Sequence, residues 1–291
     1  MPSPPRTWLI TGASSGFGLE LARLAARRGD RVIATSRKPE RIPTNDIDSD
    51  QFHTAQLDHN QSLDEVKASL DKILSTFGQI DIVVNNAAYV QMGTVEESTP
   101  EETLRQFQAN ALGPMNVYRA ILPYMREKRS GTLVTIGSMA AWYSMPACNL
   151  YNASKAALRW LAIGLAGEVE QFGIRHCLVE PGFFRTRLLD PSANIADSTA
   201  RIADYKETNA TAEKNLMAFN GLQLGNPVKG AEVIYDVVTS TGCAKGRELP
   251  SLLPLGSDAS VEIAKAASQV LAEIETWKEV SALSDFPDAA L

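Results

Sequence analysis

A tyrosine and a lysine four residues apart, in Tyr151-Asn152-Ala153-Ser154-Lys155, form the pair best suited to proton chemistry in this sequence. On a helix the two side chains share one face, about 6 Å apart along the axis. A neighbouring ammonium favours the phenolate, so Lys155 is expected to lower the phenol pKa from its usual value of about 10. The same spacing occurs by chance in many helices. The pair therefore counts as a site only if the chain also supplies a cofactor, an oxyanion donor and a pocket.

A glycine-rich loop near the start of the chain is the first indication of a cofactor. The apolar run Trp8–Ile10 leads into Thr11–Gly18, and a helical pattern follows. Strand, glycine loop and helix in this order can hold a pyrophosphate at the helix N-terminus. The spacing predicts a tight turn at Gly12, close backbone approach at Gly16, and close packing of helix and strand at Gly18. A glycine-rich turn without a ligand is the alternative.

The residues after the second predicted strand, Arg31–Thr35, bear on cofactor choice. An NAD-specific fold places a carboxylate there for the ribose 2′-hydroxyl, but this sequence has Ser36-Arg37-Lys38. Arg37, with Lys38 behind it, can neutralise a 2′-phosphate through charge-assisted hydrogen bonds. The sequence therefore predicts NADP(H) in preference to NAD(H), with a pair of exposed loop cations as the alternative.

Further apolar runs predict the rest of a parallel sheet with helices between its strands. The run at residues 80–84 is almost unbroken, which is typical of a strand buried on both faces. The expected strands are Phe52–Leu57, Ile80–Val84, Gly131–Ser138, Ile174–Val179 and Leu252–Leu255, and the expected helices are Pro100–Lys128, Asn152–Phe172, Gly230–Thr239 and Ser260–Lys278. Asp58, after the third strand, is a candidate for the adenine amine or merely a cap for a helix near Ser62.

Polar residues stand where several of these elements end or bend. Asn85 and Asn86 follow a buried strand and are expected to support the cofactor cleft structurally. Asn110 lies inside a long helix beside Gly113-Pro114, a sequence that predicts a kink. Ser138 ends a strand at the carboxyl edge of the sheet, where a substrate hydroxyl or carbonyl is expected to bind.

The segment 183–229 breaks into short pieces without strong regular structure and predicts a lid or substrate loop, with a surface excursion as the alternative. Aromatic and apolar residues of this segment and of the loop after Ser138 are candidates for an apolar pocket. These residues are Trp142, Tyr143, Met145, Phe183, Phe184, Tyr205, Met217 and Phe219. The last helix is expected to bury one apolar face, formed by Ile263, Ala267, Val270, Leu271, Ile274 and Trp277.

Composition limits the classes of partner. The 291 residues are 44% hydrophobic and carry a net charge of −6 without a basic block, which argues against nucleic-acid or membrane-surface binding. We expect one α/β domain over residues 1–291, with its core at about 7–280. Three well-separated cysteines and the lack of a leader sequence or membrane span favour a soluble, cytoplasmic protein. The histidines have no spacing suited to a metal, and none is expected.

Taken together, the motifs resemble those of the short-chain dehydrogenase/reductase family. The residues that carry the resemblance are Thr11-Gly12-x3-Gly16-x-Gly18, Asn85-Asn86-Ala87, Asn110, Ser138, Tyr151-x3-Lys155 and Pro181-Gly182. Phe17 and the lengthened tail resemble the hydroxysteroid and retinol dehydrogenase branch. The resemblance implies a Rossmann-like doubly wound parallel sheet of seven strands in the order 3-2-1-4-5-6-7. It also implies homodimers or homotetramers built on the helices that carry Asn110 and Tyr151.

The resemblance also implies residue roles. Ser138 is expected to bond the substrate oxygen and Tyr151 to give or take its proton. Lys155 is expected to hold the nicotinamide ribose, and Asn110 to position a water that links Lys155 to solvent. The implied cofactor contacts are Gly12, Ser14, Ser15, Gly16, Phe17, Gly18, Arg37, Asp58, Asn86, Ala87, Tyr151, Lys155, Pro181, Gly182 and Thr186.

These parts predict an NADP(H)-dependent oxidoreductase that interconverts a ketone or aldehyde and an alcohol. Hydride transfer at the nicotinamide is coupled to proton transfer by Tyr151. Reduction of a hydrophobic or aromatic carbonyl compound is the expected direction. An isomerase, epimerase or dehydratase that uses a bound cofactor, or a non-catalytic NADP-sensing or scaffold protein, remains the alternative.

Overall fold

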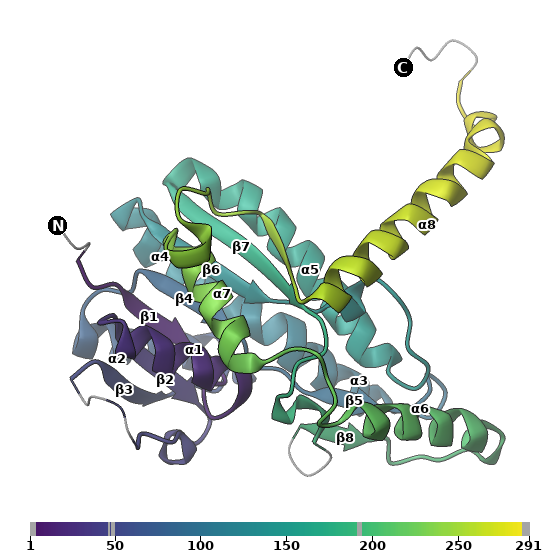
Figure 1. Cartoon of the computed structure of the whole chain (residues 1–291), viewed down its shortest axis with the longest axis horizontal. Coiled ribbons are helices and arrows are strands. Elements are labelled where there is room, and N and C mark those ends of the chain that lie inside the picture. The colour runs from purple at the N-terminus through teal and green to yellow at the C-terminus, as the bar shows by residue number, and fades with distance from the viewer. Residues whose placement is uncertain (1–3, 46, 48–49, 191–193, 287–291) are drawn as a thin grey trace.

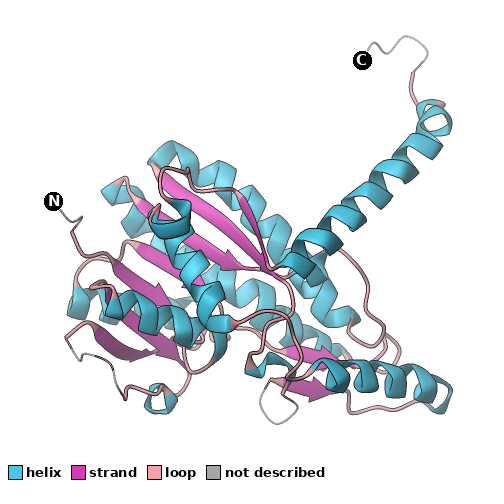
Figure 2. Cartoon of the chain, viewed as in Figure 1, coloured by secondary structure: helices cyan, strands magenta, loops and turns pink. Residues whose placement is uncertain are grey.

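The computed structural model describes residues 4–45, 47, 50–190 and 194–286. The described residues form a seven-stranded parallel sheet with helices on both faces, and a smaller two-stranded sheet beside it (Figures 1 and 2). The large sheet consists of β1 (Thr7–Ile10), β2 (Arg31–Ser36), β3 (Phe52–Gln56), β4 (Ile82–Asn85), β6 (Gly131–Ile136), β7 (Ile174–Pro181) and β9 (Leu252–Leu255). Their order across the sheet is β3-β2-β1-β4-β6-β7-β9. Counted within this sheet, the predicted order 3-2-1-4-5-6-7 is confirmed.

Helices cover both faces of the sheet. The helices of the described residues are α1 (Gly16–Arg27), α2 (Leu63–Phe77), α3 (Pro100–Phe107), α4 (Gly113–Lys128), α5 (Asn149–Val169), α6 (Lys206–Phe219), α7 (Pro227–Thr239) and α8 (Ser257–Ala282). Of these, α6 lies beside the small sheet and α8 extends away from the body (Figure 1). Because side chains alternate between the faces of a strand, Trp8 and Ile10 of β1 face α1 and α7. Leu9, between them, packs with α2, α4 and α5 on the other face. Both faces are therefore buried, as the apolar runs predict.

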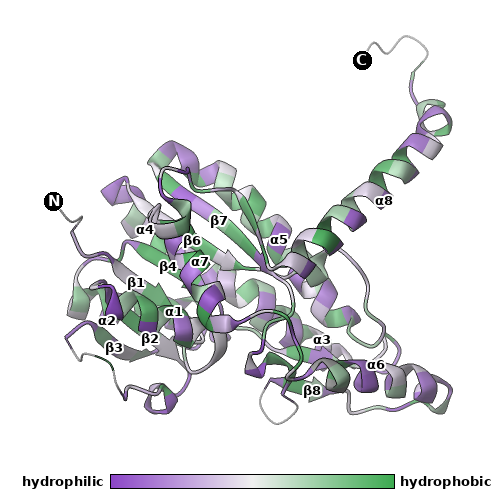
Figure 3. Cartoon of the chain, in the orientation of Figure 1, coloured by the Kyte–Doolittle hydropathy of each residue, from purple (hydrophilic) through white to green (hydrophobic). Residues whose placement is uncertain are grey.

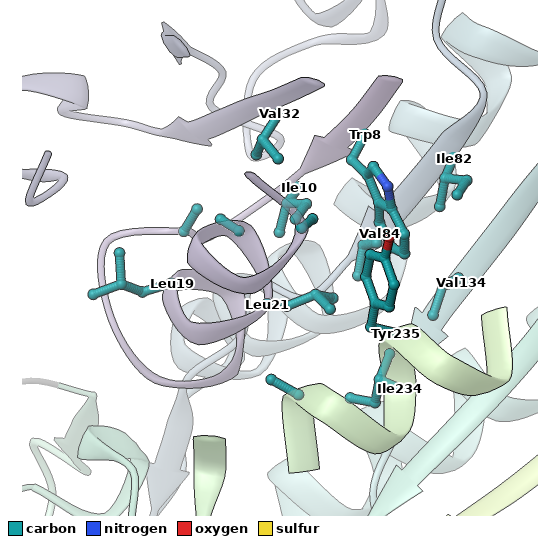
Figure 4. Packing of buried hydrophobic residues seen from close by; sticks show 14 of the residues in the cluster. Trp8, Ile10, Leu19, Leu21, Val32, Ile82, Val84, Val134, Ile234 and Tyr235 are labelled. Carbon is teal, nitrogen blue, oxygen red and sulfur yellow. The ribbon is translucent and has the colours of Figure 1, made fainter. Parts of the chain in front are cut away.

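A buried carboxylate links β1 and α7 within the core that lies under α1 and α7. The Trp8 and Tyr235 rings stack with centroids 5.4 Å apart (Figure 4). Asp30 accepts hydrogen bonds from Trp8 Nε1 at 2.8 Å and from the Tyr235 hydroxyl at 2.9 Å. This arrangement ties β1, α7 and the turn before β2 together, which fixes the base of the glycine-loop unit.

The long helix predicted at residues 100–128 is divided at Asn110. A π-helical turn, Gln108–Leu112, separates α3 from α4. Gly113 and Pro114 follow this turn, so the helix is interrupted at the place where the sequence predicts a kink. The turn buries Asn110 and points it away from solvent.

The segment 183–229 contains more regular structure than the sequence indicates. It includes the helix α6 and the strand β8 (Ile195–Asp197), which pairs in parallel with β5 (Val90–Met92). The prediction of a segment without strong regular structure is therefore wrong. The reason is that β8 is stabilised by β5, a strand about a hundred residues away, and short-range periodicity cannot detect such pairing.

The last helix differs from its predicted packing. Only the first turns of α8 lie against the body, where Ala259 and Ile263 are buried beside Met139. The rest projects outward (Figure 1), and apolar residues continue along it (Figure 3). Val270, Leu271, Ile274 and Trp277 are 55–66% exposed, so the expectation of a buried face is wrong from Val270 onward within this chain. Across the described residues, no helix has the length and apolarity required to cross a bilayer.

Candidate active site

A cavity of about 1040 Å³ lies at the carboxyl ends of the sheet strands. Loops that follow β1, β2, β3, β4, β6 and β7 meet there, as parallel strands require at one edge of a sheet. The predicted site residues that line it are Gly12, Ser14, Ser15, Gly16, Phe17, Arg37, Asp58, Asn86, Ala87, Ser138, Tyr151, Lys155, Pro181, Gly182 and Thr186. Gly18 and Asn110 are predicted site residues that do not line the cavity.

The glycine loop has the conformation that the spacing predicts. Gly12 and Gly16 have φ of +65° and +58°, a region that side chains with a Cβ rarely adopt. A Cβ on Gly12 would lie 2.7 Å from the Cα of Ala87, and one on Gly18 would lie 2.6 Å from the Gly12 carbonyl oxygen. Gly18 therefore acts through packing of α1 against the loop. Asn86 Nδ2 donates to the Thr11 and Gly12 carbonyl oxygens at 3.0 and 3.2 Å, which confirms its structural role.

The N-terminus of α1 suits a phosphate group. Ser14, Ser15 and Gly16, at the start of this helix, line the cavity. Within the described chain, Ser15 makes no capping hydrogen bond through its side chain, and the first turn of α1 carries no acidic residue. Unsatisfied N–H groups and the helix dipole together favour an anion at this position. The cradle and its donors therefore fit the pyrophosphate of a dinucleotide.

Arg37 and Asp58 stand at the far end of the cavity. Arg37 is exposed and borders the cavity, whereas Lys38 is exposed outside its wall. The Asp58 carboxylate accepts from the backbone N–H of Asn60 at 3.0 Å. The cap of α2 is Ser62, which forms a reciprocal capping box with Glu65. Asp58 is therefore not the cap of that helix, and its position on the cavity wall leaves the predicted contact with an adenine amine open.

The proposed proton-transfer pair lies on one face of α5, inside the cavity. Tyr151 is hydrogen-bonded to Ser138 and is 6% exposed. Lys155 is 2% exposed, and its Nζ donates to the Ile136 carbonyl oxygen at 2.8 Å. Sequence reasoning placed these side chains together, and the structure brings all three to the wall of the cavity.

The electrostatics of the pair differ from the expectation. Burial raises the pKa of Tyr151 to about 12, although the hydrogen bond with Ser138 opposes the rise. Burial also lowers the pKa of Lys155 to about 8, while the Glu180 carboxylate opposes that change. The expected lowering of the phenol pKa by Lys155 is therefore absent among the protein's own groups. Desolvation of the phenol determines the direction of its pKa change, and the ammonium donates its hydrogen bond to the Ile136 carbonyl oxygen.

Asn110 is connected to α5 through a residue that sequence reasoning missed. Its Nδ2 donates to Ser154 Oγ at 3.1 Å and to the Tyr89 carbonyl oxygen at 2.9 Å. Ser154 in turn donates to the Tyr151 carbonyl oxygen at 2.7 Å. Ser154 stands between Tyr151 and Lys155 in the sequence, and its position three residues after Tyr151 was the available signal. The π-helical turn is thus fixed to the helix that carries the pair.

Apolar and aromatic residues form the other end of the cavity. Of the predicted set, Tyr143, Met145, Phe183 and Phe184 line it, and Leu188, Ile195 and Leu216 are lining residues that the sequence did not single out. Two expectations are wrong. Trp142 turns its indole N–H to Glu180 at 2.6 Å, and the Tyr205 hydroxyl donates to Glu96 at 2.8 Å outside the cavity. The side chains of Met217 and Phe219 lie outside those that the structure describes.

No group of three or more histidine, cysteine, aspartate or glutamate side chains suited to a metal ion occurs in the described ranges. The cavity is lined by hydroxyl and amide groups and by charged side chains of both signs, among them Arg37, Asp58 and Lys155.

Comparison with known proteins gives consistent matches. Residues 6–195 match the family model described as short chain dehydrogenase. The chain is 32% identical to oxidoreductase BOA17 of Botryotinia fuckeliana, over 96% of this chain and 99% of that protein. It is 36% identical to a 3-ketodihydrosphingosine reductase of Bacteroides thetaiotaomicron, over 70% of this chain and 73% of the other. The solved structure of a short-chain dehydrogenase from Streptomyces avermitilis superposes with a TM-score of 0.84 and 34% identity, covering 97% and 100% of the two chains.

Proposed function

The chain belongs to the short-chain dehydrogenase family of oxidoreductases, and from that premise we propose that it is a single-domain, NADP(H)-dependent carbonyl reductase. The observation that carries the proposal is the meeting of Ser138, Tyr151 and Lys155 on the wall of one cavity with the glycine loop. A proton donor, a polar anchor and a phosphate cradle then border the same space.

The geometry supports the following residue roles. When bound, the nicotinamide supplies or accepts the hydride. Ser138 bonds the substrate oxygen, and Tyr151 transfers a proton to or from that oxygen. Because burial raises the pKa of Tyr151 to about 12, the phenol carries its proton at neutral pH. A protonated donor suits reduction of a carbonyl, and the relative named 3-ketodihydrosphingosine reductase supports that direction.

The cofactor preference rests on Arg37. The guanidinium stands beside the cavity after β2, and the adjacent cavity residue Ser36 is uncharged. An arginine there favours a 2′-phosphate through bidentate, charge-assisted hydrogen bonds. NADP(H) is therefore the proposed cofactor, with NAD(H) bound more weakly.

The substrate class follows from the apolar end of the cavity. Tyr143, Met145, Phe183 and Leu188 offer apolar contact to a molecule whose oxygen reaches Ser138. A hydrophobic or aromatic ketone or aldehyde fits this wall. The segment 183–229 supplies part of it, so this segment is proposed to set substrate choice.

A carbonyl panel tests the proposed function. Steroid, retinoid, polyketide-like and aliphatic ketones are assayed with NADPH and with NADH, and the oxidation of the cofactor is measured. The expected result is turnover of a hydrophobic ketone with NADPH preferred. Activity confined to small polar sugars or hydroxy acids rejects the hydrophobic pocket, and product formation without net NADPH consumption indicates an isomerase or epimerase instead.

We also propose that the protein is a cytoplasmic homodimer or homotetramer built on α4 and α5. Trp160, Leu161 and Ile163 of α5 are 67%, 39% and 39% exposed, which is unusual for side chains of this size. The free thiols of Cys148, Cys177 and Cys243 suit a reducing compartment. Sedimentation at several protein concentrations tests the assembly, and a strictly monomeric chain contradicts it.

A further inference from the structure

Glu180 is a buried carboxylate to which the proposed reaction gives no role. It precedes Pro181 at the carboxyl end of β7 and is 0% exposed. Its Cγ lies 3.1 Å from the position that a Cβ on Gly137 would occupy. Gly137 joins Ile136, which binds the Lys155 ammonium, to Ser138. The carboxylate side chain therefore packs directly against the backbone of the catalytic segment.

Two side chains from other elements hold this carboxylate. Its Oε2 accepts a hydrogen bond from Trp142 Nε1 at 2.6 Å, and its Oε1 lies 3.4 Å from Arg159 Nε. The Arg159 guanidinium also stacks over the Trp142 ring, 4.1 Å from its centroid. The triad thus joins β7, the loop after Ser138 and α5. Each member contacts the other two, so the loop is fixed relative to the helix.

The charged groups around Glu180 and Lys155 come from β7 and α5. Arg159, four residues after Lys155 on α5, lies 3.4 Å from Glu180 Oε1, and the charges of both cations favour the ionised form of Glu180. Burial raises the pKa of Glu180, and the Trp142 hydrogen bond and the two cations oppose that rise. Burial lowers the pKa of Lys155 to about 8, and Glu180 is the charged group that opposes this. Cys148, whose pKa burial raises to about 11, faces Tyr151 from the start of α5.

We propose that Glu180 is a positioning residue for the reaction proposed above: its carboxylate preserves the charge of Lys155, and its bond to Trp142 fixes the loop that follows Ser138. Burial keeps the Tyr151 phenol protonated at rest, but an ammonium on the same helix face favours the phenolate that forms as the proton leaves. A buried negative charge behind the ammonium compensates for its lost hydration. Glu180 acts through Lys155 and Trp142 and lies outside the cavity wall.

Two variants separate the charge of Glu180 from its hydrogen bond. Glu180→Gln keeps an acceptor for Trp142 but removes the charge, and Trp142→Phe keeps the charge but removes the hydrogen bond. The titration of Lys155 is measured in the protein without added cofactor, by competitive acetylation and mass spectrometry across neutral and alkaline pH. NADPH affinity and kcat/KM are measured over the same range.

The expected results differ for the two variants. In Glu180→Gln, Lys155 loses its proton at lower pH than in the wild type, because the opposing charge is gone. A fall of one pKa unit removes about tenfold of kcat/KM at mildly alkaline pH. Trp142→Phe is expected to raise KM for the carbonyl substrate while leaving the Lys155 titration unchanged. Glu180→Asp, which restores the charge, is expected to restore the wild-type titration.

Several outcomes overturn the inference. The inference is overturned if the pKa of Lys155 is unchanged in folded Glu180→Gln. It is also overturned if Trp142→Phe lowers the pKa of Lys155 as much as Glu180→Gln does. If Glu180→Gln does not fold because Arg159 is left unpaired, the double variant Glu180→Gln, Arg159→Met removes both charges, and a smaller fall of the Lys155 pKa is expected, because a like charge is removed as well. The titration needs no carbonyl substrate. A wild type without NADPH-dependent turnover therefore rejects the proposed function, while the Lys155 result still decides the role of Glu180.

Discussion

The Lys155 ammonium donates a 2.8 Å hydrogen bond to the carbonyl oxygen of Ile136, at the end of β6. This bond places the cation between the strand that leads to Ser138 and the helix that carries Tyr151. Burial is the largest influence on the Tyr151 phenol and raises its pKa to about 12, against the hydrogen bond with Ser138. The site is thus arranged with a protonated tyrosine, which is the state required to donate a proton to a carbonyl.

Tyr151→Phe tests the proton donor directly. The ring keeps its packing, but the group that carries the proton is lost, so kcat is expected to fall by about 10²–10⁴-fold. NADPH affinity, measured by cofactor fluorescence, is expected to stay close to that of the wild type. Tyr143→Phe is the matched control, because Tyr143 also lines the cavity, and most turnover should remain. Substantial activity in Tyr151→Phe contradicts the assignment.

Arg37→Ala tests the cofactor preference. Loss of charge-assisted hydrogen bonds to a 2′-phosphate costs about 1.5–3 kcal/mol, so NADPH affinity should fall by roughly tenfold to a hundredfold. NADH affinity should change little, since NADH lacks that phosphate. Lys38→Ala, on the neighbouring exposed cation outside the cavity wall, serves as control and should have a smaller effect. Equal losses for NADPH and NADH would show that Arg37 does not select between them.

Glu97→Gln tests how the substrate segment is held. The Glu97 carboxylate accepts hydrogen bonds from the Ile202 backbone N–H at 3.0 Å and from Asn209 Nδ2 at 2.8 Å. The hydrogen bond from Ile202 is the main cause that lowers its pKa to about 2. A carboxyl with a depressed folded-state pKa stabilises the protein above its unfolded-state pKa of about 4.3, and this contribution is lost as pH falls further.

The variant should therefore have a lower Tm than the wild type at neutral pH. The difference in Tm should narrow as pH falls from about 4.3 towards 2. Thermal unfolding followed by circular dichroism at each pH measures it. Glu101→Gln, on an exposed glutamate nearby, is expected to leave the Tm almost unchanged at neutral pH. A constant difference across this range would mean that the charge of Glu97 is not what holds the segment.

Gly18→Ala tests the packing of the glycine loop. The new Cβ would lie 2.5 Å from Asn86 Nδ2 and 2.6 Å from the Gly12 carbonyl oxygen, so the loop must shift. The free energy of unfolding is expected to fall by about 1–3 kcal/mol, measured by denaturant titration. Gly164→Ala is the opposite case, because nothing lies within 4 Å of its Cβ position on α5. The free energy of unfolding of that variant should rise by up to about 1 kcal/mol. Equal destabilisation by the two substitutions would contradict the assignment of the Gly18 effect to its close contacts.

Much of the fold and part of the site could be predicted from local patterns. The almost unbroken apolar run of β4 indicated a strand buried on both faces, and parallel order then placed the strand ends together. The φ values of Gly12 and Gly16 follow from residue type and spacing. The meeting of Ser138 with Tyr151 was also accessible, because each stands at a defined point of its own element.

Tertiary structure decided the properties that depend on distant partners. Trp142 donates a hydrogen bond to Glu180 and does not line the cavity, and Asn110 donates a hydrogen bond to Ser154 on α5. The distal part of α8 kept the predicted helical period but buried no face within this chain. A sequence pattern shows which face of an element is apolar, and contacts formed elsewhere determine whether that face is covered.

The same division applies to Tyr151 and Lys155. The sequence by itself determined that a phenol and an ammonium share one face of a helix, because helical spacing is a local property. It could not determine the sign of the pKa change of Tyr151. That sign depends on how much water the folded chain removes and on which acceptor takes the ammonium, and both follow from long-range packing.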